Sequence, residues 1–425
     1  MTILRLSVAS FGGLLDTSFL PFLITSCLAI LLLSRGRTTY DGSTFIDYTS
    51  VCLVFVTSWV FFLAVSCTDI RKKTVAVYSA ILFAILTSFL SEDYVVFYAS
   101  FELTFLFIFF FLIGWGGSPE RVQASFFILF YTLVFSIPLI IFLLRYKQET
   151  VRVIFLISFS TQRRFWWVFL LVVFIVKLPL FGVHSWLPKA HVEAPVRASI
   201  LLAGILLKLG GYGLIRFVGR LSFNRLQQSW LISISLYTGV LGSLIMATTA
   251  VRQRDLKIII AYSSVVHMRI TLAGIFIYRG WGLIGGLLII IAHGLISPLL
   301  FYLITLFYNR AHSRRIILLK GGRLACPLLC LVWFFACFLN LGLPPMISFF
   351  SEVLILGAIA FLREKEWLVV LARCFITGVY CTIIFASLSH GQTSLGVVIP
   401  LKIRQITIRV WHLFFVILFP IIFFR

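Results

Sequence analysis

The chain has 425 residues, of which 61% are hydrophobic and only 12% charged, and its mean hydropathy is +1.09. A soluble domain carries about twice that share of charged residues and markedly fewer apolar ones. The composition therefore excludes a water-soluble globule, and with it a soluble nicotinamide or flavin enzyme. At about 20 apolar residues per transmembrane helix, the length accommodates about a dozen or more spans.

The formal net charge of +22 results from 36 Lys and Arg residues against 14 Asp and Glu residues. In a soluble protein such a balance would indicate nucleic-acid binding. Here the basic residues cluster in short gaps between apolar runs, at 71–73, 252–257 and 310–323. Lipid headgroups attract cations at these positions, so we expect lipid, with cardiolipin among the candidates, and no nucleic acid as partner. These three loops are expected to face the compartment on the electrically negative side of the membrane.

Apolar runs bounded by charged or turn residues predict the following spans in chain order. They lie near 19–33, 51–67, 75–90, 95–113, 122–144, 165–183, 196–217, 230–250, 256–278, 281–308, 325–341, 347–361, 367–387 and 407–424. The longest polar interruption, 145–164, contains the apolar stretch 151–159, which predicts an interfacial segment rather than a soluble domain. The sequence thus predicts a single membrane domain over 1–425, all-α and polytopic, with about 13–14 transmembrane helices.

Three interruptions differ from ordinary loops because a titratable residue lies in or beside each of them within an apolar run. They are Lys177 to Pro179, the glycine-rich stretch 208–213, and 343–345 leading to Glu352. A proline inside a span removes a hydrogen bond and exposes a carbonyl, which hydrocarbon does not tolerate unless protein or water satisfies it. Broken helices with ionisable neighbours indicate an ion pathway in a transporter.

Four charged residues lie within or directly after long apolar runs: Glu102, Lys177, Lys208 and Glu352. A charge at the centre of a span costs about 2.5–3.5 kcal/mol on insertion scales. One interpretation is a proton relay, because desolvation brings the protonation equilibria of Lys and Glu towards physiological pH. An ion pair that opens and closes would then switch the affinity of the Lys for its proton. The alternative is a static buried pair, or a lysine whose amine extends to the interface.

Histidines add candidates for proton transfer, because the imidazole titrates near neutral pH. His293 lies inside an apolar span, and His267 follows several hydroxyl-bearing residues. A hydrogen-bonded packing role is the alternative for each. His312, near a span end, could equally be interfacial.

No pattern in the chain favours a metal or redox group. The eight cysteines form no C-x-x-C, and the later ones recur at helical intervals, which predicts buried packing. Gly280 to Gly285 satisfies G-x-G-x-x-G, but it opens an apolar span with no preceding strand. The His191 and Glu193 pair lacks the second histidine of a zinc motif. We therefore expect no cofactor and no metal in this chain.

Residues 175–195 (IVKLPLFGVHSWLPKAHVEAP) and 206–217 (LLKLGGYGLIRF) closely resemble the chain 4 family of mitochondrial NADH:ubiquinone oxidoreductase, complex I. Supporting blocks are 255–257 with 261–268 (AYSSVVHM), 291–295 (IAHGL), and 340–345 (NLGLPP) followed by Glu352. These motifs occur in the right order over about residues 100–356. The stretches on either side are recognisable only by hydropathy.

The family is similar to Mrp-type sodium/proton antiporter subunits, built from two inverted repeats of five helices, each with a broken helix. The resemblance implies N-terminal helices in 1–94 and C-terminal helices in 362–425. It places a first repeat region in 95–217, with its broken helix near 165–195. The second repeat region, 218–361, would have its broken helix near 325–361.

The resemblance also implies roles for individual residues. Glu102 resembles the acidic partner of the channel lysine Lys177, and Lys208 resembles a second, connecting lysine. His293 resembles the central histidine of the relay, with His267 and His312 as flanking candidates. Glu352 resembles the terminal acid, through which protons leave or charge passes to a neighbouring subunit.

Three arginines depart from this picture: Arg197, Arg269 and Arg373. Each is costly in lipid and lacks an obvious acidic partner nearby. Of the 36 basic residues, 26 are Arg and 10 are Lys. We therefore raise the hypothesis that some arginines stand for organelle codons that the source reads as Ser or Gly.

The leading functional hypothesis is a proton-translocating membrane-arm subunit of complex I in the inner mitochondrial membrane. It implies other membrane-arm subunits as partners, including the sister antiporter-like chains. It also implies that NAD, FMN, iron–sulfur clusters and ubiquinone are bound by other subunits of the complex. The alternatives are an autonomous sodium/proton antiporter and a scaffold with a vestigial relay.

Overall fold

The computed structural model describes residues 39–40, 45–66, 72–115, 119–147, 164–180, 182–218, 230–277, 280–362, 365–391, 412–413 and 416–417. Within these ranges nearly all of the chain is helical. The exceptions are connecting turns and two short strands, β1 (Thr39–Tyr40) and β2 (Phe45–Ile46), which pair antiparallel before the first described helix.

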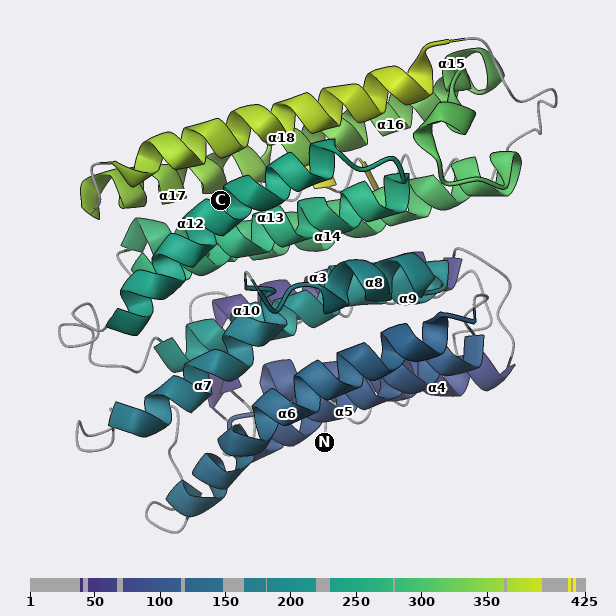
Figure 1. The fold of residues 1–425 in the computed structure, drawn as a ribbon. Coiled ribbons are helices and arrows are strands. Elements are labelled where there is room, and N and C mark those ends of the chain that lie inside the picture. The colour runs from purple at the N-terminus through teal and green to yellow at the C-terminus, as the bar shows by residue number, and fades with distance from the viewer. Residues whose placement is uncertain are drawn as a thin grey trace.

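The helices fall into two groups that lie side by side (Figure 1). The first group comprises α3 (Tyr48–Ser66), α4 (Lys72–Leu90), α5 (Tyr94–Trp115), α6 (Arg121–Lys147), α7 (Arg164–Lys177), α8 (Trp186–Glu193), α9 (Val196–Leu201), the π-helical turn η2 (Leu202–Leu206) and α10 (Leu207–Val218). The second comprises α12 (Trp230–Val251), α13 (Leu256–Ile277), α14 (Gly280–Ala311), η3 (Ile316–Leu319), α15 (Gly322–Ala325), α16 (Pro327–Leu341), α17 (Ile347–Leu362) and α18 (Glu366–Ser389). The groups meet where α14 packs on α3, α9 and η2, and where α13 packs on α8.

Eight of the described helices are long and apolar enough to cross a membrane, or nine if the segments 316–324 and 327–341, bent by 117°, form one span. Helices α7 and α17 are shorter than a full span. The prediction of an all-α polytopic membrane protein is confirmed. The predicted span 19–33, most of 407–424 and the predicted interfacial stretch 151–159 lie outside the described residues.

Helix α14 forms the centre of the described bundle because its sequence is apolar on every side. It contacts α3, α9, α13, α16 and α17. Helix α6, by contrast, presents large apolar side chains outward: Phe130 is 61% exposed and Ile137 52%. A soluble protein would not present such a face to water, so this surface is adapted to lipid.

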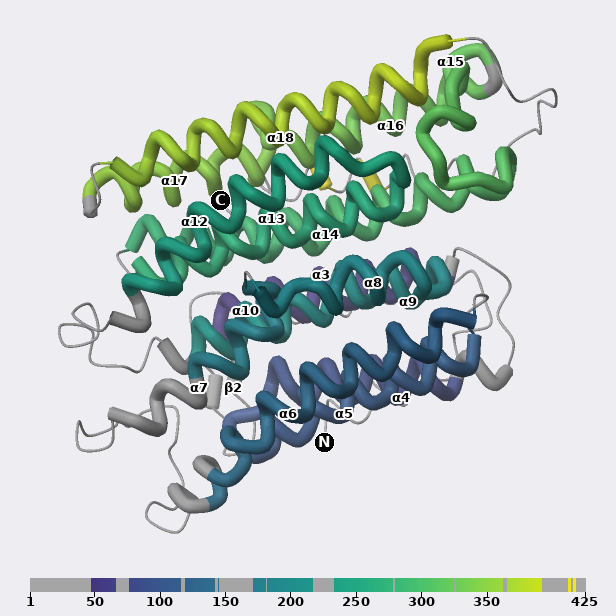
Figure 2. Tube along the Cα trace, in the orientation of Figure 1, coloured from purple at the N-terminus to yellow at the C-terminus, as the bar shows by residue number. Residues whose placement is uncertain are grey.

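Two predicted helix breaks are visible in the structure. Helix α7 ends at Lys177, and a turn through Pro179 precedes α8. Helix α16 ends at Leu341, where Gly342 adopts a left-handed conformation (φ +76°) that favours glycine. Figure 2 shows α16 and α17 following one another along α18, against which both half-helices pack.

Candidate functional site

Glu102 and Lys177 form a buried ion pair between α5 and the end of α7. Lys177 Nζ lies 2.6 Å from Glu102 Oε1. Lys177 is 2% exposed and Glu102 is 8% exposed. The ammonium also lies 3.3 Å from the ring centroid of Phe101 and 4.3 Å from that of Phe105, where the negative faces of the rings stabilise a cation. Lys177 is thereby held at the point where the helix breaks.

The second oxygen of Glu102, Oε2, is buried and has no hydrogen-bond partner among the described residues. The carboxylate is therefore stabilised chiefly through its contact with the ammonium of Lys177. In a low-dielectric environment, separating the two charges is costly unless one of the groups changes its protonation state. Opening of the pair would therefore favour neutralisation of one of the two groups.

Lys208 lies two residues after the end of the π-helical turn η2, at the start of α10. Its ammonium contacts the carbonyl oxygen of Ala203, within that turn. Its Nζ also lies 2.8 Å from Nδ1 of His293, on α14. Lys208 is only 1% exposed. Single π turns are frequent at functional sites because they release backbone groups from the helical ladder, and here the Ala203 carbonyl receives the lysine side chain.

Gly294 makes the approach of α14 to Lys208 feasible. A Cβ atom at this position would lie 2.9 Å from Val56 Cγ1 and 3.2 Å from Lys208 Cε. Both distances are shorter than ordinary van der Waals contact. The lysine side chain therefore occupies space that only a glycine leaves open.

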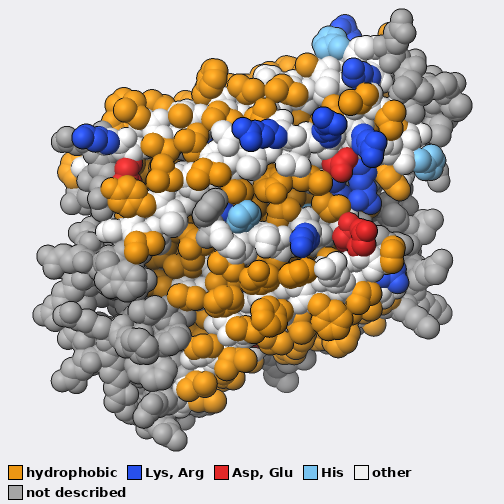
Figure 3. All heavy atoms as spheres, in the orientation of Figure 1, with side chains coloured by type: hydrophobic (Ala, Val, Ile, Leu, Met, Phe, Trp, Pro, Cys, Tyr) orange, Lys and Arg blue, Asp and Glu red, His pale blue; other side chains and the backbone are white. Residues whose placement is uncertain are grey.

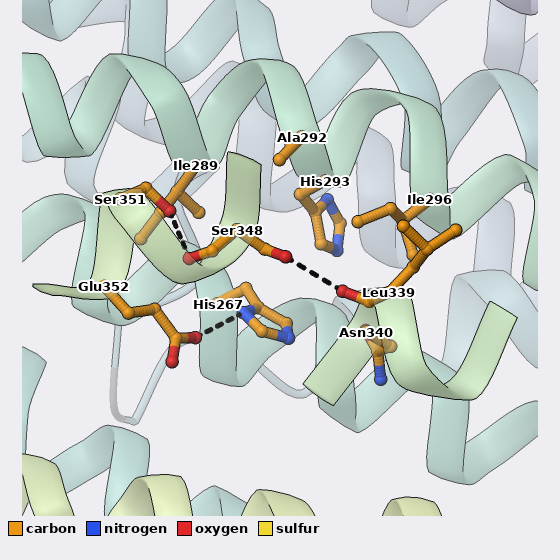
Figure 4. A pocket seen from close by; sticks show the side chains of 10 residues that line it. All are labelled: His267, Ile289, Ala292, His293, Ile296, Leu339, Asn340, Ser348, Ser351 and Glu352. Carbon is orange, nitrogen blue, oxygen red and sulfur yellow. Dashed lines mark hydrogen bonds and ion pairs between the residues drawn. The ribbon is translucent and has the colours of Figure 1, made fainter. Parts of the chain in front are cut away.

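His293 and His267 lie next to each other at a small enclosed cavity (Figure 4). Their ring centroids are 5.8 Å apart. Besides the two imidazoles, the polar residues Asn340, Ser348 and Glu352 contribute to the lining. The space open to the centre of a water molecule is about 10 Å³, which is close to the minimum for one water molecule, about 10–15 Å³. The cavity is therefore sized for one bridging water at most.

Glu352 on α17 completes the cluster. Its Oε1 lies 3.6 Å from His267 Nδ1, and the dashed line in Figure 4 marks this pair. Arg373 on α18 lies 2.8 Å from the same carboxylate oxygen and 3.1 Å from His267 Nδ1. Our expectation that Arg373 lacks an acidic partner is therefore wrong. The partner is 21 positions away in the sequence and becomes adjacent because α17 and α18 pack together.

The structure thus brings six of the seven predicted relay residues into two groups, in which all but the half-buried Glu352 are buried. One is Glu102 with Lys177; the other is Lys208, His293, His267 and Glu352. The groups are neighbours in the fold, since a Cβ at Gly210, two residues after Lys208, would lie 3.2 Å from Lys177 Cβ. His312 lies apart, exposed at the end of α14, where its ring contacts Tyr308.

Sequence reasoning missed Lys257, at the start of α13. Its ammonium donates to the carbonyl oxygens of Val192 (3.0 Å) and Ala194 (2.7 Å), at the end of α8. Arg314 donates to the same Val192 carbonyl at 3.0 Å. The last carbonyls of a helix have no partner within the helix, so these cations satisfy them and fix the half-helix that follows the first break. The sequence placed Lys257 in a basic gap between apolar runs, and its backbone partners leave no signal in the spacing of side chains.

Among the described residues, no group of three or more His, Cys, Asp and Glu side chains could hold a metal ion. Six of the cysteines lie in the described part of the chain, and all six are thiols. Five of these are buried.

Comparison with known proteins shows the family of the chain. A family model described as NADH:quinone oxidoreductase/Mrp antiporter, transmembrane, matches residues 91–379. NADH-ubiquinone oxidoreductase chain 4 of Ceratitis capitata is 39% identical over 323 residues, which cover 75% of this chain and 71% of that one. The chain 4 protein of Squalus acanthias is 35% identical over 368 residues, covering 82% and 79%.

Solved structures with a similar fold include a chain of respiratory complex I from Thermus thermophilus with bound NADH. It superposes with a TM-score of 0.87 at 22% identity and covers 99% of this chain and 95% of that one. A chain of the Mrp complex from Dietzia sp. gives a TM-score of 0.82 at 15% identity, with 99% and 90% covered. At these identities the two structures support a shared fold.

Proposed function

Because this chain belongs to the NADH-ubiquinone oxidoreductase chain 4 family, within the NADH:quinone oxidoreductase/Mrp antiporter group, we propose that it translocates protons as a membrane-arm subunit of complex I. The observation that carries the proposal is the contact of 2.8 Å between Lys208 Nζ and His293 Nδ1. A lysine and an imidazole at this distance, buried in an apolar bundle, can exchange a proton directly.

The Glu102–Lys177 pair acts as the switch. While the pair is closed, the carboxylate and the rings of Phe101 and Phe105 stabilise the protonated ammonium. When the pair opens, the ammonium loses its counter-charge in a low-dielectric environment and releases its proton towards Lys208. Closing the pair restores the affinity of Lys177 for a proton.

The second group passes the proton on. Lys208 gives a proton to Nδ1 of His293, and the imidazolium that forms releases the proton from its other nitrogen, Nε2. The small cavity between His293 and His267 has room for one water molecule to bridge the rings. His267 then transfers the proton to Glu352, the terminal acid of the relay. His312 is outside this route because it lies apart from the cluster.

In this proposal the chain performs no redox step. NAD, FMN, iron–sulfur clusters and ubiquinone would act in other subunits, and electrostatic changes along the polar axis would open the Glu102–Lys177 pair. The membrane would be the inner mitochondrial membrane, as the names of the chain 4 relatives suggest. The partners would be the other membrane-arm subunits, including the sister antiporter-like chains.

The proposal is tested by proton uptake into vesicles that contain the assembled complex, measured per NADH oxidised. Lys208→Met removes the titratable amine and is expected to abolish proton transfer through this subunit while the complex still assembles. Lys320→Met, at an exposed position outside the relay, is the matched control. Unchanged pumping in the Lys208→Met complex would contradict the proposal.

An autonomous sodium/proton antiporter is less well supported. Similarity to the Mrp complex concerns the fold alone, whereas curated relatives at 33–40% identity bear the chain 4 name. The purified chain in liposomes with an imposed sodium gradient distinguishes the two functions. We expect no sodium-driven proton movement without the other complex I subunits.

A further inference from the structure

One buried histidine, His412, has no part in the proposed relay. Figure 3 shows acidic and basic side chains gathered towards one end of a broadly apolar face. His412 lies instead in the interior, where it is 0% exposed. Its Nδ1 lies 2.6 Å from Nε1 of Trp59, on α3, and its Nε2 lies 2.9 Å from the carbonyl oxygen of Leu295, on α14. The imidazole thus bridges α3 and α14.

These two contacts determine the protonation state of His412. The indole N–H of Trp59 can only donate, so Nδ1 of His412 must accept and carries no hydrogen. The carbonyl of Leu295 can only accept, so the hydrogen of the neutral imidazole lies on Nε2. A second hydrogen, on Nδ1, would face the indole N–H across 2.6 Å. The partners therefore hold His412 neutral and in one tautomer, which is unsuited to carrying a proton.

The hydrogen bond to α14 is made beside the relay. Leu295 is two residues after His293. Pro298, inside the same helix, has no N–H, so one carbonyl of the preceding turn lacks its helical partner. The hydrogen bonds of the helix itself therefore hold this turn less firmly than the rest. Side chains bind neighbouring carbonyls here: the Ser297 hydroxyl donates to the carbonyl of His293 at 2.7 Å, and His412 donates to that of Leu295.

The part of α3 around Trp59 touches both elements whose contact the relay needs. Val60 packs on η2, the turn that precedes Lys208, since a Cβ at Gly204 would lie 2.6 Å from Val60 Cγ1. Val56, one turn before, lies close to the glycine that follows the relay histidine on α14. The rings of Trp59 and His412 also stack, with centroids 5.9 Å apart and planes at 25°. The imidazole therefore fastens α14 to the helix against which η2 packs.

We propose that His412 is a positioning residue for proton transfer between Lys208 and His293. Its two hydrogen bonds hold α14 against α3 and thereby set the distance from Lys208 Nζ to His293 Nδ1. This inference rests on the proposed function, because the distance matters to the reaction only if a proton passes between these groups. A displacement of about 1 Å at such a contact lowers a rate about 100-fold. His412 thus acts on the relay through another residue and never binds the transferred proton.

The first test uses the unmodified protein. The full chain, labelled with ¹⁵N in the rings of its seven histidines, is placed in nanodiscs for NMR. The signals of His412 and His293 are identified by their loss in the variants His412→Gln and His293→Gln. At neutral pH we expect His412 to have a hydrogen on Nε2 and none on Nδ1. A hydrogen on Nδ1, in the other tautomer or in an imidazolium, would overturn the proposal.

The second test measures the effect on His293. His412→Leu removes both hydrogen bonds and should shift the His293 signals, because Lys208 Nζ moves away from Nδ1. His412→Gln keeps an acceptor and a donor and should shift them less. His390→Leu, at an exposed position after α18, is the matched control and should leave them unchanged.

A second variant covers the case in which His412→Leu does not fold. Trp59→Phe keeps an aromatic ring on α3 and removes only one of the two hydrogen bonds of His412. It should shift the His293 signals in the same direction by a smaller amount. Unchanged His293 signals in a folded chain with either substitution would overturn the proposal, whether or not the relay operates.

The third test links the position of His293 to proton transfer. In the assembled complex with His412→Leu, we expect coupled NADH oxidation to fall at least about tenfold. Its solvent deuterium isotope effect should rise, because transfer between more distant groups becomes rate-limiting. A shift of the His293 signals with unchanged rate and isotope effect would disprove the role of His412 in the reaction. Normal pumping by Lys208→Met would instead refute the relay itself, while the NMR signals still report how α14 is held.

Discussion

Lys208 and His293 are 85 positions apart in the chain, yet their side-chain nitrogens lie 2.8 Å apart at the centre of the described bundle. The contact depends on two backbone features, the π turn before Lys208 and the glycine that follows His293. It joins the first group of helices to the second. It places Lys208 in direct contact with the cluster of His293, His267 and Glu352, on which the proposed proton route depends.

Replacing His293 should interrupt proton transfer at this point. In His293→Gln the amide can still accept a hydrogen bond from Lys208, but it cannot take up and release a proton. We expect coupled NADH oxidation to fall about 100-fold, the usual contribution of a positioned proton-transfer group. His312→Gln, at the exposed end of the same helix, should leave the rate unchanged. Equal rates for the two variants would remove His293 from the relay.

Gly294→Ala should disturb the same contact sterically. The added methyl group would lie 2.9 Å from Val56 Cγ1 and 3.2 Å from Lys208 Cε. We expect overpacking to cost about 1–3 kcal/mol of stability and to move Lys208 away from His293. Gly280→Ala, on the same helix with no atom within 4 Å of the new Cβ, is the control. Thermal unfolding of the purified chain would show a lower midpoint only for Gly294→Ala; an unchanged midpoint would contradict the close packing.

Asp47 and Arg216 should make stability depend on pH. The guanidinium donates two hydrogen bonds, of 2.6 and 2.7 Å, to the Asp47 carboxylate at the start of α3. Burial alone would raise the pKa of Asp47, but the positive charge of Arg216 and four hydrogen bonds outweigh it and lower the pKa. The contribution is therefore present above the unfolded pKa, about 3.9, and is lost as pH falls through the lower folded value.

Asp47→Asn should accordingly lower the free energy of unfolding near neutral pH by about 1–3 kcal/mol. The unfolding midpoint should fall with it. The difference from the unmodified chain should shrink as the pH falls below about 3.9, because the unfolded chain then binds a proton at Asp47 that the folded chain does not bind. Circular dichroism during thermal unfolding in detergent measures both midpoints. A difference that stays constant from neutral pH down to about pH 3 would show that the ion pair does not contribute.

Peptide masses from the native protein test the hypothesis about the arginines. If the source reads the codons at 197 and 269 as Ser or Gly, trypsin will not cleave after these positions. Each peptide that spans one of them will then be lighter than the same peptide with Arg. Arg373 belongs to the same test, although its contact with Glu352 accommodates an arginine there. Detection of Arg at 197 and 269 would disprove the hypothesis.

Much of the site could be predicted because charge in a bilayer is costly. Glu102, Lys177, Lys208, His293 and Glu352 were identifiable as ionisable residues within apolar runs, and the structure places each of them in a buried contact or cluster. Proline and glycine likewise indicated where α7 and α16 end. The division into two inverted repeats stays a prediction, as do the individual roles in proton transfer.

Contacts between distant segments could not be predicted. The pairing of Arg373 with Glu352 depends on how α18 lies against α17, and hydropathy contains no information on that rotation. The same is true of Lys257, whose partners are backbone carbonyls and leave no signature in side-chain spacing.

The central claim is that Lys177 is a switchable proton carrier and not a fixed counter-ion of Glu102. The most direct measurement is the number of protons translocated per NADH oxidised by the assembled complex that carries Lys177→Met, with assembly checked on a native gel and the exposed Lys365→Met as control. The account predicts an intact complex that has lost proton translocation through this subunit. Normal pumping in an intact Lys177→Met complex would show that the lysine is structural and would contradict the account.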